Sequence, residues 1–242
     1  MKSRICVLTV LALAAGASAQ TVYDTSVTPT FFPGTGIPNA NFVVHNNVPA
    51  QVQTGMTSFY RFGVRGPGDN ALRDSMTLNT YSYRNGNAYT DGSATTIAPG
   101  TAAWNFSYHI NLNTDTQQSN GQNFFNNLVL LTIDWDPTAG VDQRTYNMSA
   151  LMQAGGAGSL SLLQDSQNPG FSFWNDPLFL AISGAAPRVF DPNATGTYRF
   201  QLDVIRGATT VSSTEMFVNV TPTPGAAALF GLGSLAAFRR RR

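Results

Sequence analysis

The stretch AWNFSYHINL, residues Ala103–Leu112, alternates between small or polar side chains and large apolar ones. Successive side chains of a β-strand point to opposite faces, so one face of this segment would be apolar and the other polar. The apolar face carries Trp104, Phe106, Tyr108, Ile110 and Leu112. The polar face carries Ala103, Asn105, Ser107, His109 and Asn111. This pattern predicts a half-buried antiparallel strand whose polar face, with His109, meets solvent.

A second alternation runs through Thr197–Val204, with Tyr198, Phe200, Leu202 and Val204 on the inward face. Turn residues separate this segment from other runs with strand composition. We expect these further strands at Asn41–His45, Thr57–Val64, Met76–Arg84, Asn127–Trp135, Pro177–Ile182 and Val211–Val220. Many short strands between turns are typical of a sandwich. The sequence therefore predicts an all-β fold, an antiparallel β-sandwich of the Ig-like or jelly-roll-like type, with one or two short helices at Ser149–Gln153 and around Ser159–Asp165.

The turn and strand at Asp191–Val204 contain the pattern G-T-Y-x-F-x-L-x-V. This pattern resembles the start of the penultimate strand in Ig-like and PKD-like domains. The resemblance implies that the Tyr198 hydroxyl closes the corner between two strands.

Composition excludes two classes of protein. Lys and Glu occur once each, so a coiled coil or helical bundle is not expected. With 43% hydrophobic and 11% aromatic residues, the chain has enough apolar surface to fold, which excludes a disordered tail protein.

The first residues, MKSRICVLTVLALAAGASAQ, have the three parts of a cleavable secretory signal. Lys2 and Arg4 precede an apolar run, and small residues end at Ala19. We expect cleavage between Ala19 and Gln20, which gives a signal peptide at residues 1–19 and export from the cytoplasm. An uncleaved N-terminal anchor helix is the alternative. Cys6 is the only cysteine and lies in this leader, so residues 20–221, the predicted β-sandwich domain, must fold without a disulfide.

The last residues form a second addressing segment, at 222–242. Pro222-Thr223-Pro224-Gly225 precedes a short apolar run, Ala226–Phe238, and four arginines, Arg239, Arg240, Arg241 and Arg242. The run is shorter than the ~20 residues of a comfortable membrane span, and the arginines would remain at the cytoplasmic side. This arrangement resembles the PEP-CTERM sorting signal of exported bacterial proteins. The resemblance implies a transient membrane anchor and a partner, an exosortase-like membrane protease; Thr223 stands where that motif has glutamate. A plain membrane anchor is the alternative.

The body between the two ends carries a net negative charge. Six of the 14 basic residues lie in the terminal segments, whereas all 13 acidic residues lie in the body. A basic footprint is therefore absent, and we expect no nucleic-acid partner. Tyr108–Asp115, Leu128–Gly140 and Leu163–Phe173, with Phe190–Val220, also resemble uncharacterised PEP-CTERM proteins. That resemblance implies a role at the cell surface or in the extracellular matrix and supplies no active site.

Residues that carry chemistry are few. His45 and His109 lack a second ligand at helical spacing, and no G-x-S-x-G motif is present, so we expect neither a histidine metal site nor a serine hydrolase. Asp134 and Asp136 share a strand face and could cooperate; the alternative is a solvated strand end. The oxygens of Asp134–Thr138 and of Asp191–Thr195 are compatible with calcium or with Asx turns. We expect no cofactor.

Aromatic side chains offer the other candidate site. Tyr81, Tyr83 and Tyr89 lie among asparagines, and could form a platform for a glycan or a hairpin with half-buried rings. Trp104 and Trp135 are expected in the core, and Trp174 is ambiguous. The sequence thus predicts a non-catalytic, exported surface or matrix protein. The alternative is a carbohydrate-binding module for exopolysaccharide, and a hydrolase would require Asp134 or Asp136 beside His45 or His109.

Overall fold

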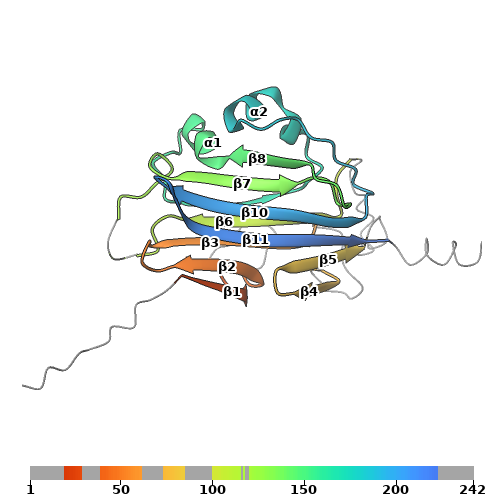
Figure 1. Cartoon of the computed structure of the whole chain (residues 1–242), viewed down its shortest axis with the longest axis horizontal. Coiled ribbons are helices and arrows are strands. Elements are labelled where there is room, and N and C mark those ends of the chain that lie inside the picture. The colour runs from red at the N-terminus through yellow and green to blue at the C-terminus, as the bar shows by residue number, and fades with distance from the viewer. Residues whose placement is uncertain are drawn as a thin grey trace, which may run out of the picture.

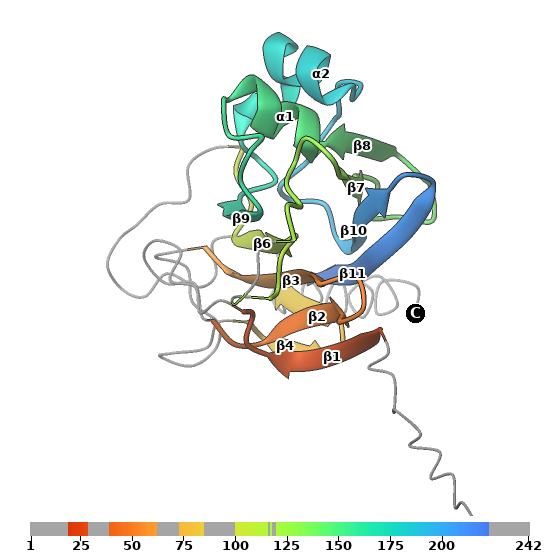
Figure 2. The same cartoon turned by 90° about the vertical axis from the view of Figure 1, so that its left-hand side faces the viewer.

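The computed structural model describes residues 19–28, 39–61, 73–84, 100–115, 117 and 120–222. These residues form two β-sheets packed around a common core, with two short helices along one edge (Figure 1). The first sheet has five strands in the order β1-β2-β3-β6-β9, and the second has six in the order β4-β5-β11-β10-β7-β8. Figure 2 shows β6 and β9 of the first sheet on one side and β7 and β10 of the second on the other.

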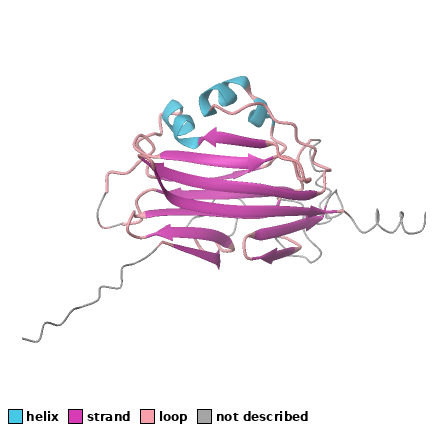
Figure 3. Cartoon of the chain, in the orientation of Figure 1, coloured by secondary structure: helices cyan, strands magenta, loops and turns pink. Residues whose placement is uncertain are grey.

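The strands are β1 (Gln20–Thr25), β2 (Phe42–Asn47), β3 (Val52–Tyr60), β4 (Ser75–Thr77), β5 (Thr80–Arg84), β6 (Trp104–Asn111), β7 (Leu128–Asp134), β8 (Gln143–Asn147), β9 (Leu162–Gln167), β10 (Gly196–Arg206) and β11 (Thr209–Thr221). The helices are α1 (Met148–Ala154) and α2 (Pro177–Ser183), preceded by a 3-10 turn at Ser172–Asn175. Strands form most of the regular structure, and both helices lie beside β8 (Figure 3). The prediction of a mostly β fold with two sheets and short helices is confirmed.

Alternation located the central strands correctly. β10 buries the four side chains predicted to face inward, while Thr197, Arg199 and Asp203 on its other face are at least partly exposed. The strands β6, β7 and β11 also lie where the sequence places them. Their large side chains meet between the sheets, where Trp104 packs against Tyr198 and Phe200 at ring-centroid distances of 5.5 and 6.0 Å.

The prediction that the polar face of β6 meets solvent is wrong. Ser107 and His109 are fully buried, and Asn111 is nearly so. The segment before β2 covers this face, because Asn111 Nδ2 donates a hydrogen bond of 2.9 Å to the Thr28 carbonyl. β3 and β9 flank β6 on either side, and of the polar side chains on this face only Asn105 remains partly exposed. Alternation indicates which residues share a face, but it does not reveal whether another segment covers that face.

Two local predictions are wrong, and capping explains one of them. Pro177–Ile182 forms helix α2 rather than a strand, because Asp176 caps it by accepting hydrogen bonds from the N–H groups of Leu178 and Phe179. Pro177 occupies the first turn, where a missing N–H costs nothing, and Gly184 ends the helix at a φ of 74°. Around Ser159–Asp165 the chain forms strand β9 rather than a second helix. The other predicted helix, at Ser149–Gln153, is present as α1.

Three details of the sheets depart from the expectation. β5 pairs with β11 in parallel, whereas every other pair between the described strands is antiparallel. The strand expected at Met76–Arg84 is divided into β4 and β5 by a turn in which Leu78 has a φ of 53°. Tyr198 is buried at the start of β10, but no described residue forms a hydrogen bond with its hydroxyl, so the tyrosine corner is not formed by this part of the chain.

Candidate functional site

The two histidines lie in the first sheet and far from the candidate carboxylates. His45, in β2, is half-buried, and its Nδ1 lies 2.8 Å from the Ser212 hydroxyl of β11. His109 faces away from the second sheet, on the side of β6 opposite its core residues, and its Nδ1 lies 2.8 Å from Gln164 Nε2. Burial lowers the pKa of both imidazoles, that of His109 to about 4. Both rings are therefore neutral at pH 7.

The contact between His45 and Ser212 was missed from the sequence, since the residues are 167 positions apart. It belongs to a chain of hydroxyls between the sheets: Thr54 Oγ1 lies 2.7 Å from both Ser212 Oγ and Thr214 Oγ1. Ser212 is only 1% exposed, and no described carboxylate contacts His45. A nucleophilic serine needs access to substrate and an oriented base. We interpret these linked hydroxyl groups as polar packing that joins the two sheets.

Asp134 and Asp136 form turns with their own backbone. Asp134 Oδ1 accepts hydrogen bonds from the N–H groups of Asp136 and Asp142 at 3.2 and 2.9 Å. Asp136 Oδ1 accepts from the Thr138 hydroxyl and N–H, and these bonds lower the pKa of its carboxyl. Of the two interpretations of these aspartates, a calcium loop or Asx turns, the observed hydrogen bonds fit the Asx turns. Among the described residues, no group of three or more acidic, histidine or cysteine side chains could hold a metal ion. Asp191 forms a similar turn with the N–H of Asn193 at 2.8 Å.

The carboxylates and histidines do not meet. Asp134 pairs with Arg199 near the start of β10, whereas the Ser212 partner of His45 pairs with Val204, five residues further along. The sole glutamate of the chain, Glu215, forms an ion pair with Arg199 at 2.5 Å. The arrangement that a hydrolase would require is therefore not formed by these residues.

The predicted glycan platform is not on the surface. Tyr81 and Tyr83 are fully buried in β5, and Trp174 is 2% exposed. The Tyr81 hydroxyl donates to the Asn41 carbonyl at 2.7 Å, and the Tyr83 ring packs edge-on against Tyr60. β5 lies between β4 and β11 rather than at an edge, which explains its burial. Tyr89 lies outside the described residues.

We expect these core tyrosines to resist ionisation. Burial raises the pKa of Tyr81 and of Tyr146 to about 12, and raises the pKa of Tyr83, Tyr108 and Tyr198 as well. A raised folded-state pKa contributes stability that is present below pH 10 and is lost as pH increases. Near pH 11, tyrosinate absorbance of the native protein should be well below that of the urea-unfolded protein, in which tyrosines ionise near pH 10. Coincident titration curves would contradict the buried positions.

One buried cation, Arg188, is held without an acidic partner among the described residues. Its guanidinium lies 4.1 Å from the centroid of the Trp135 ring, and its Nη2 donates to the carbonyl oxygens of Pro169 and Phe171. Burial lowers the pKa of Arg188 to about 10, which leaves it charged at neutral pH. Nη2 therefore links the guanidinium to the backbone around Pro169, whereas no described residue accepts a hydrogen bond from the buried Nε.

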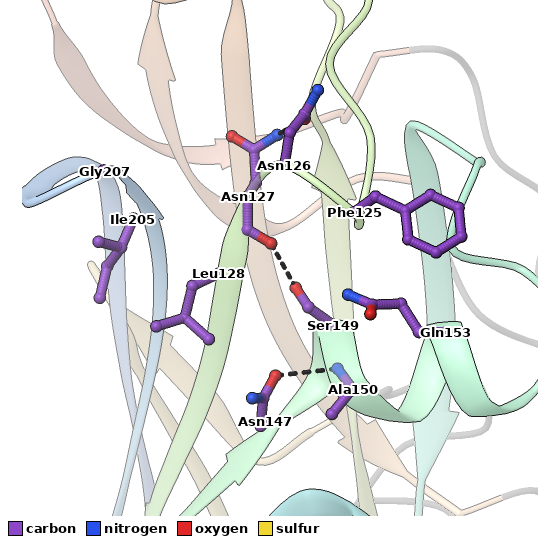
Figure 4. Close-up of a pocket in the computed structure, with 10 residues that line it drawn as sticks. All are labelled: Phe125, Asn126, Asn127, Leu128, Asn147, Ser149, Ala150, Gln153, Ile205 and Gly207. Atoms are coloured by element: carbon purple, nitrogen blue, oxygen red, sulfur yellow. Dashed lines mark hydrogen bonds between the residues drawn. The ribbon is translucent and has the colours of Figure 1, made fainter.

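A hollow of about 380 Å³ opens where β7 begins (Figure 4). Three segments line it: the turn before β7 with Leu128, helix α1 from Ser149 to Gln153 with Asn147, and the end of β10 with the following turn at Gly207. Phe125 is 64% exposed and Leu128 is 38% exposed. No described residue that lines the hollow carries a charge. Its volume is within the ~300–1,000 Å³ of small-molecule sites.

Two side chains hold the walls of this hollow in place. The Ser149 hydroxyl donates to the Asn127 carbonyl at 2.7 Å and accepts from the Val129 N–H at 2.9 Å. Asn127 Oδ1 accepts from Arg206 Nε at 3.0 Å, and its Nδ2 donates to the Asn123 carbonyl at 2.9 Å. These groups are paired within the fold, so they shape the site and are not free to bind a ligand.

The terminal residues predicted for processing are only partly described. Ala19 directly precedes β1, Gln20 begins that strand, and Pro222 follows β11. Thr223, Pro224, Gly225 and Arg239–Arg242, as well as residues 1–18, lie outside the described residues. Within the described part, no helix is long and apolar enough to cross a membrane.

No protein-family model, curated protein or solved structure matches the chain.

Proposed function

We propose that this chain is an exported protein of the cell surface or extracellular matrix, sorted by an exosortase-type system and performing a non-catalytic, structural role. In this proposal, the leader 1–19 directs export, and the segment 222–242 anchors the protein in the membrane until the protease cuts near Pro224. The body, residues 20–221, is the part that remains.

The observation that carries the proposal is the position of the first and last strands. Gln20 begins β1 and pairs with Asn46, and Thr221 ends β11 and pairs with Arg84. The two predicted cleavage regions therefore border the strand pairing and do not interrupt it. Removal of both ends would leave every described strand intact.

The chemistry of the body also supports this proposal. The core is built from aromatic and aliphatic side chains of both sheets without a disulfide, as an exported protein with no cysteine outside its leader requires. His109 is fully buried, His45 is half-buried, and the aspartates form turns, which suits a scaffold better than a catalyst. We also propose that the two sheets form a sandwich of the Ig-like or jelly-roll-like type.

The proposal is tested by the intact mass of the protein recovered from its native envelope and medium. We expect a chain that begins at Gln20 and ends near Pro224. A mass that retains Arg239–Arg242 would show a plain anchor and overturn the exosortase step, and a mass that retains residues 1–19 would overturn cleavage of the leader. Replacement of both Pro222 and Pro224 by alanine should block removal of the tail, whereas the control Thr223→Glu, which restores the family's motif, should leave it unchanged.

A further inference from the structure

The hollow beside α1 contains two amide side chains that are each fixed at one end. Asn147 Oδ1 accepts a hydrogen bond of 2.9 Å from the Ala150 N–H, as the N-cap of α1. Gln153 Nε2 donates a hydrogen bond of 2.7 Å to the Phe124 carbonyl. Because an N–H can meet only the oxygen of an amide, and a carbonyl only its nitrogen, these contacts define the orientation of both side chains.

The other end of each amide is free. No described residue forms a hydrogen bond with Asn147 Nδ2 or with Gln153 Oε1. The hollow therefore offers one fixed donor and one fixed acceptor, held by the fold before any ligand arrives. Fixed polar groups lose little conformational entropy when they bind, which favours recognition.

An exposed aromatic ring completes the site. Phe125 packs against the backbone of Gly158, where an added Cβ would lie 2.7 Å from Phe125 Cζ. Gly158 thus leaves room for the ring, which is supported on that side and 64% exposed overall. In Figure 4 the ring lies on the same side as Gln153, while Leu128 and Ile205 lie on the other. The site combines an aromatic face, two aliphatic side chains and two free amide groups.

We propose that this hollow binds a short neutral saccharide. One sugar ring would pack its C–H face on Phe125 and donate a hydroxyl to Gln153 Oε1, and the next would accept from Asn147 Nδ2 beside Leu128 and Ile205. Sugars present both apolar faces and hydroxyls, and so match this combination. A charged ligand would lose its hydration in an uncharged site without compensation. The site is separate from the buried tyrosines and does not depend on processing of the chain ends.

The test uses ligand-observed saturation-transfer NMR with the protein purified from its native envelope. The probes are four neutral disaccharides: maltose, cellobiose, lactose and diacetylchitobiose. We expect at least one to bind with a Kd on the order of 1 mM, as suits two rings held by few contacts. Absence of saturation transfer from all four at about 50 mM would overturn the proposal.

Two variants assign the binding to this hollow. Phe125→Ala should weaken binding at least about tenfold. Asn147→Ser keeps a side-chain oxygen that can cap α1 and removes the free amide donor without adding a charge, so it should weaken binding about fivefold without unfolding the protein. The control is Phe171→Ala, which truncates another partly exposed phenylalanine, 37% exposed and outside the hollow. Unchanged binding by Phe125→Ala, or an equal loss in Phe171→Ala, would contradict the assignment.

Discussion

Replacing Asn168 by alanine is expected to lower the free energy of unfolding by about 4 kcal/mol, one of the largest effects of any single polar substitution in this protein. Asn168 is fully buried directly after β9. Its side chain exchanges two hydrogen bonds with Ala102: the Ala102 N–H donates to Oδ1 at 2.9 Å, and Nδ2 donates to the Ala102 carbonyl at 3.0 Å. Paired residues of antiparallel strands exchange the same two bonds, so this amide pairs with the backbone ahead of β6 as a neighbouring strand would, beyond the last pair of β6 and β9, Phe106 with Gln167.

Further partners explain the size of the effect. Asn168 Oδ1 also accepts from the Gly170 N–H at 2.9 Å, and Nδ2 also lies 3.1 Å from the Trp104 carbonyl. Alanine would leave these backbone groups without partners in the interior, and each such group costs ~1–3 kcal/mol. Urea unfolding followed by tryptophan fluorescence measures the loss, since Trp174 Nε1 donates to the Asn168 carbonyl at 3.0 Å.

Two other variants separate hydrogen bonding from shape. Asn168→Asp preserves the shape but places an oxygen where Nδ2 now faces the carbonyls of Ala102 and Trp104. We expect it to destabilise the fold strongly at pH 7 and to recover partly in mild acid, where the carboxyl is protonated. Asn219→Ala is the control, because no described residue bonds to that half-buried side chain, and it should change stability by less than ~0.5 kcal/mol. Similar stability of Asn168→Ala and Asn219→Ala would contradict the assigned role.

The sequence predicts the centre of this fold better than its periphery. Alternation places β6 and β10 correctly because each pairs on both sides and packs its large side chains between the sheets. Helix α2 was missed, although Asp176, Pro177 and Gly184 are cap residues at the spacing of a short helix. The apolar residues of this helix have the composition of a strand, so only the cap residues indicated a helix.

The polar interior could not be predicted from local patterns. Asn168 contacts residues 63 to 66 positions away, and nothing in its neighbourhood distinguishes it from a surface asparagine. The hollow could not be predicted from local patterns either, because three separate segments line it: the turn before β7, helix α1 with Asn147, and the end of β10. One local signal was present: a helix that starts near Ser149 requires a cap, and Asn147 is suited to that position.

Acidification is expected to destabilise the protein by about 3 kcal/mol between pH 6.5 and pH 4, well before most carboxylates are protonated. The cause is His109, whose ring is fully buried in β6 and whose pKa is lowered to about 4 by burial. In the unfolded chain this histidine binds a proton below pH 6.5, whereas in the fold it does so only below about pH 4. Between these values the unfolded state holds more protons, so stability rises with pH.

Urea unfolding measured at several pH values from 4 to 7 gives this dependence. His109→Gln should abolish most of it, because glutamine does not ionise and can keep a hydrogen bond with the side chain of Gln164. His45→Gln is the matched control: burial also lowers the pKa of His45, but its side chain is only half-buried, so most of the dependence should remain. The carboxyl of Asp136, whose pKa is already lowered, contributes only below this range. An undiminished slope in His109→Gln would place the responsible proton elsewhere, and the polar face of β6 would then be open to water, as alternation alone predicts.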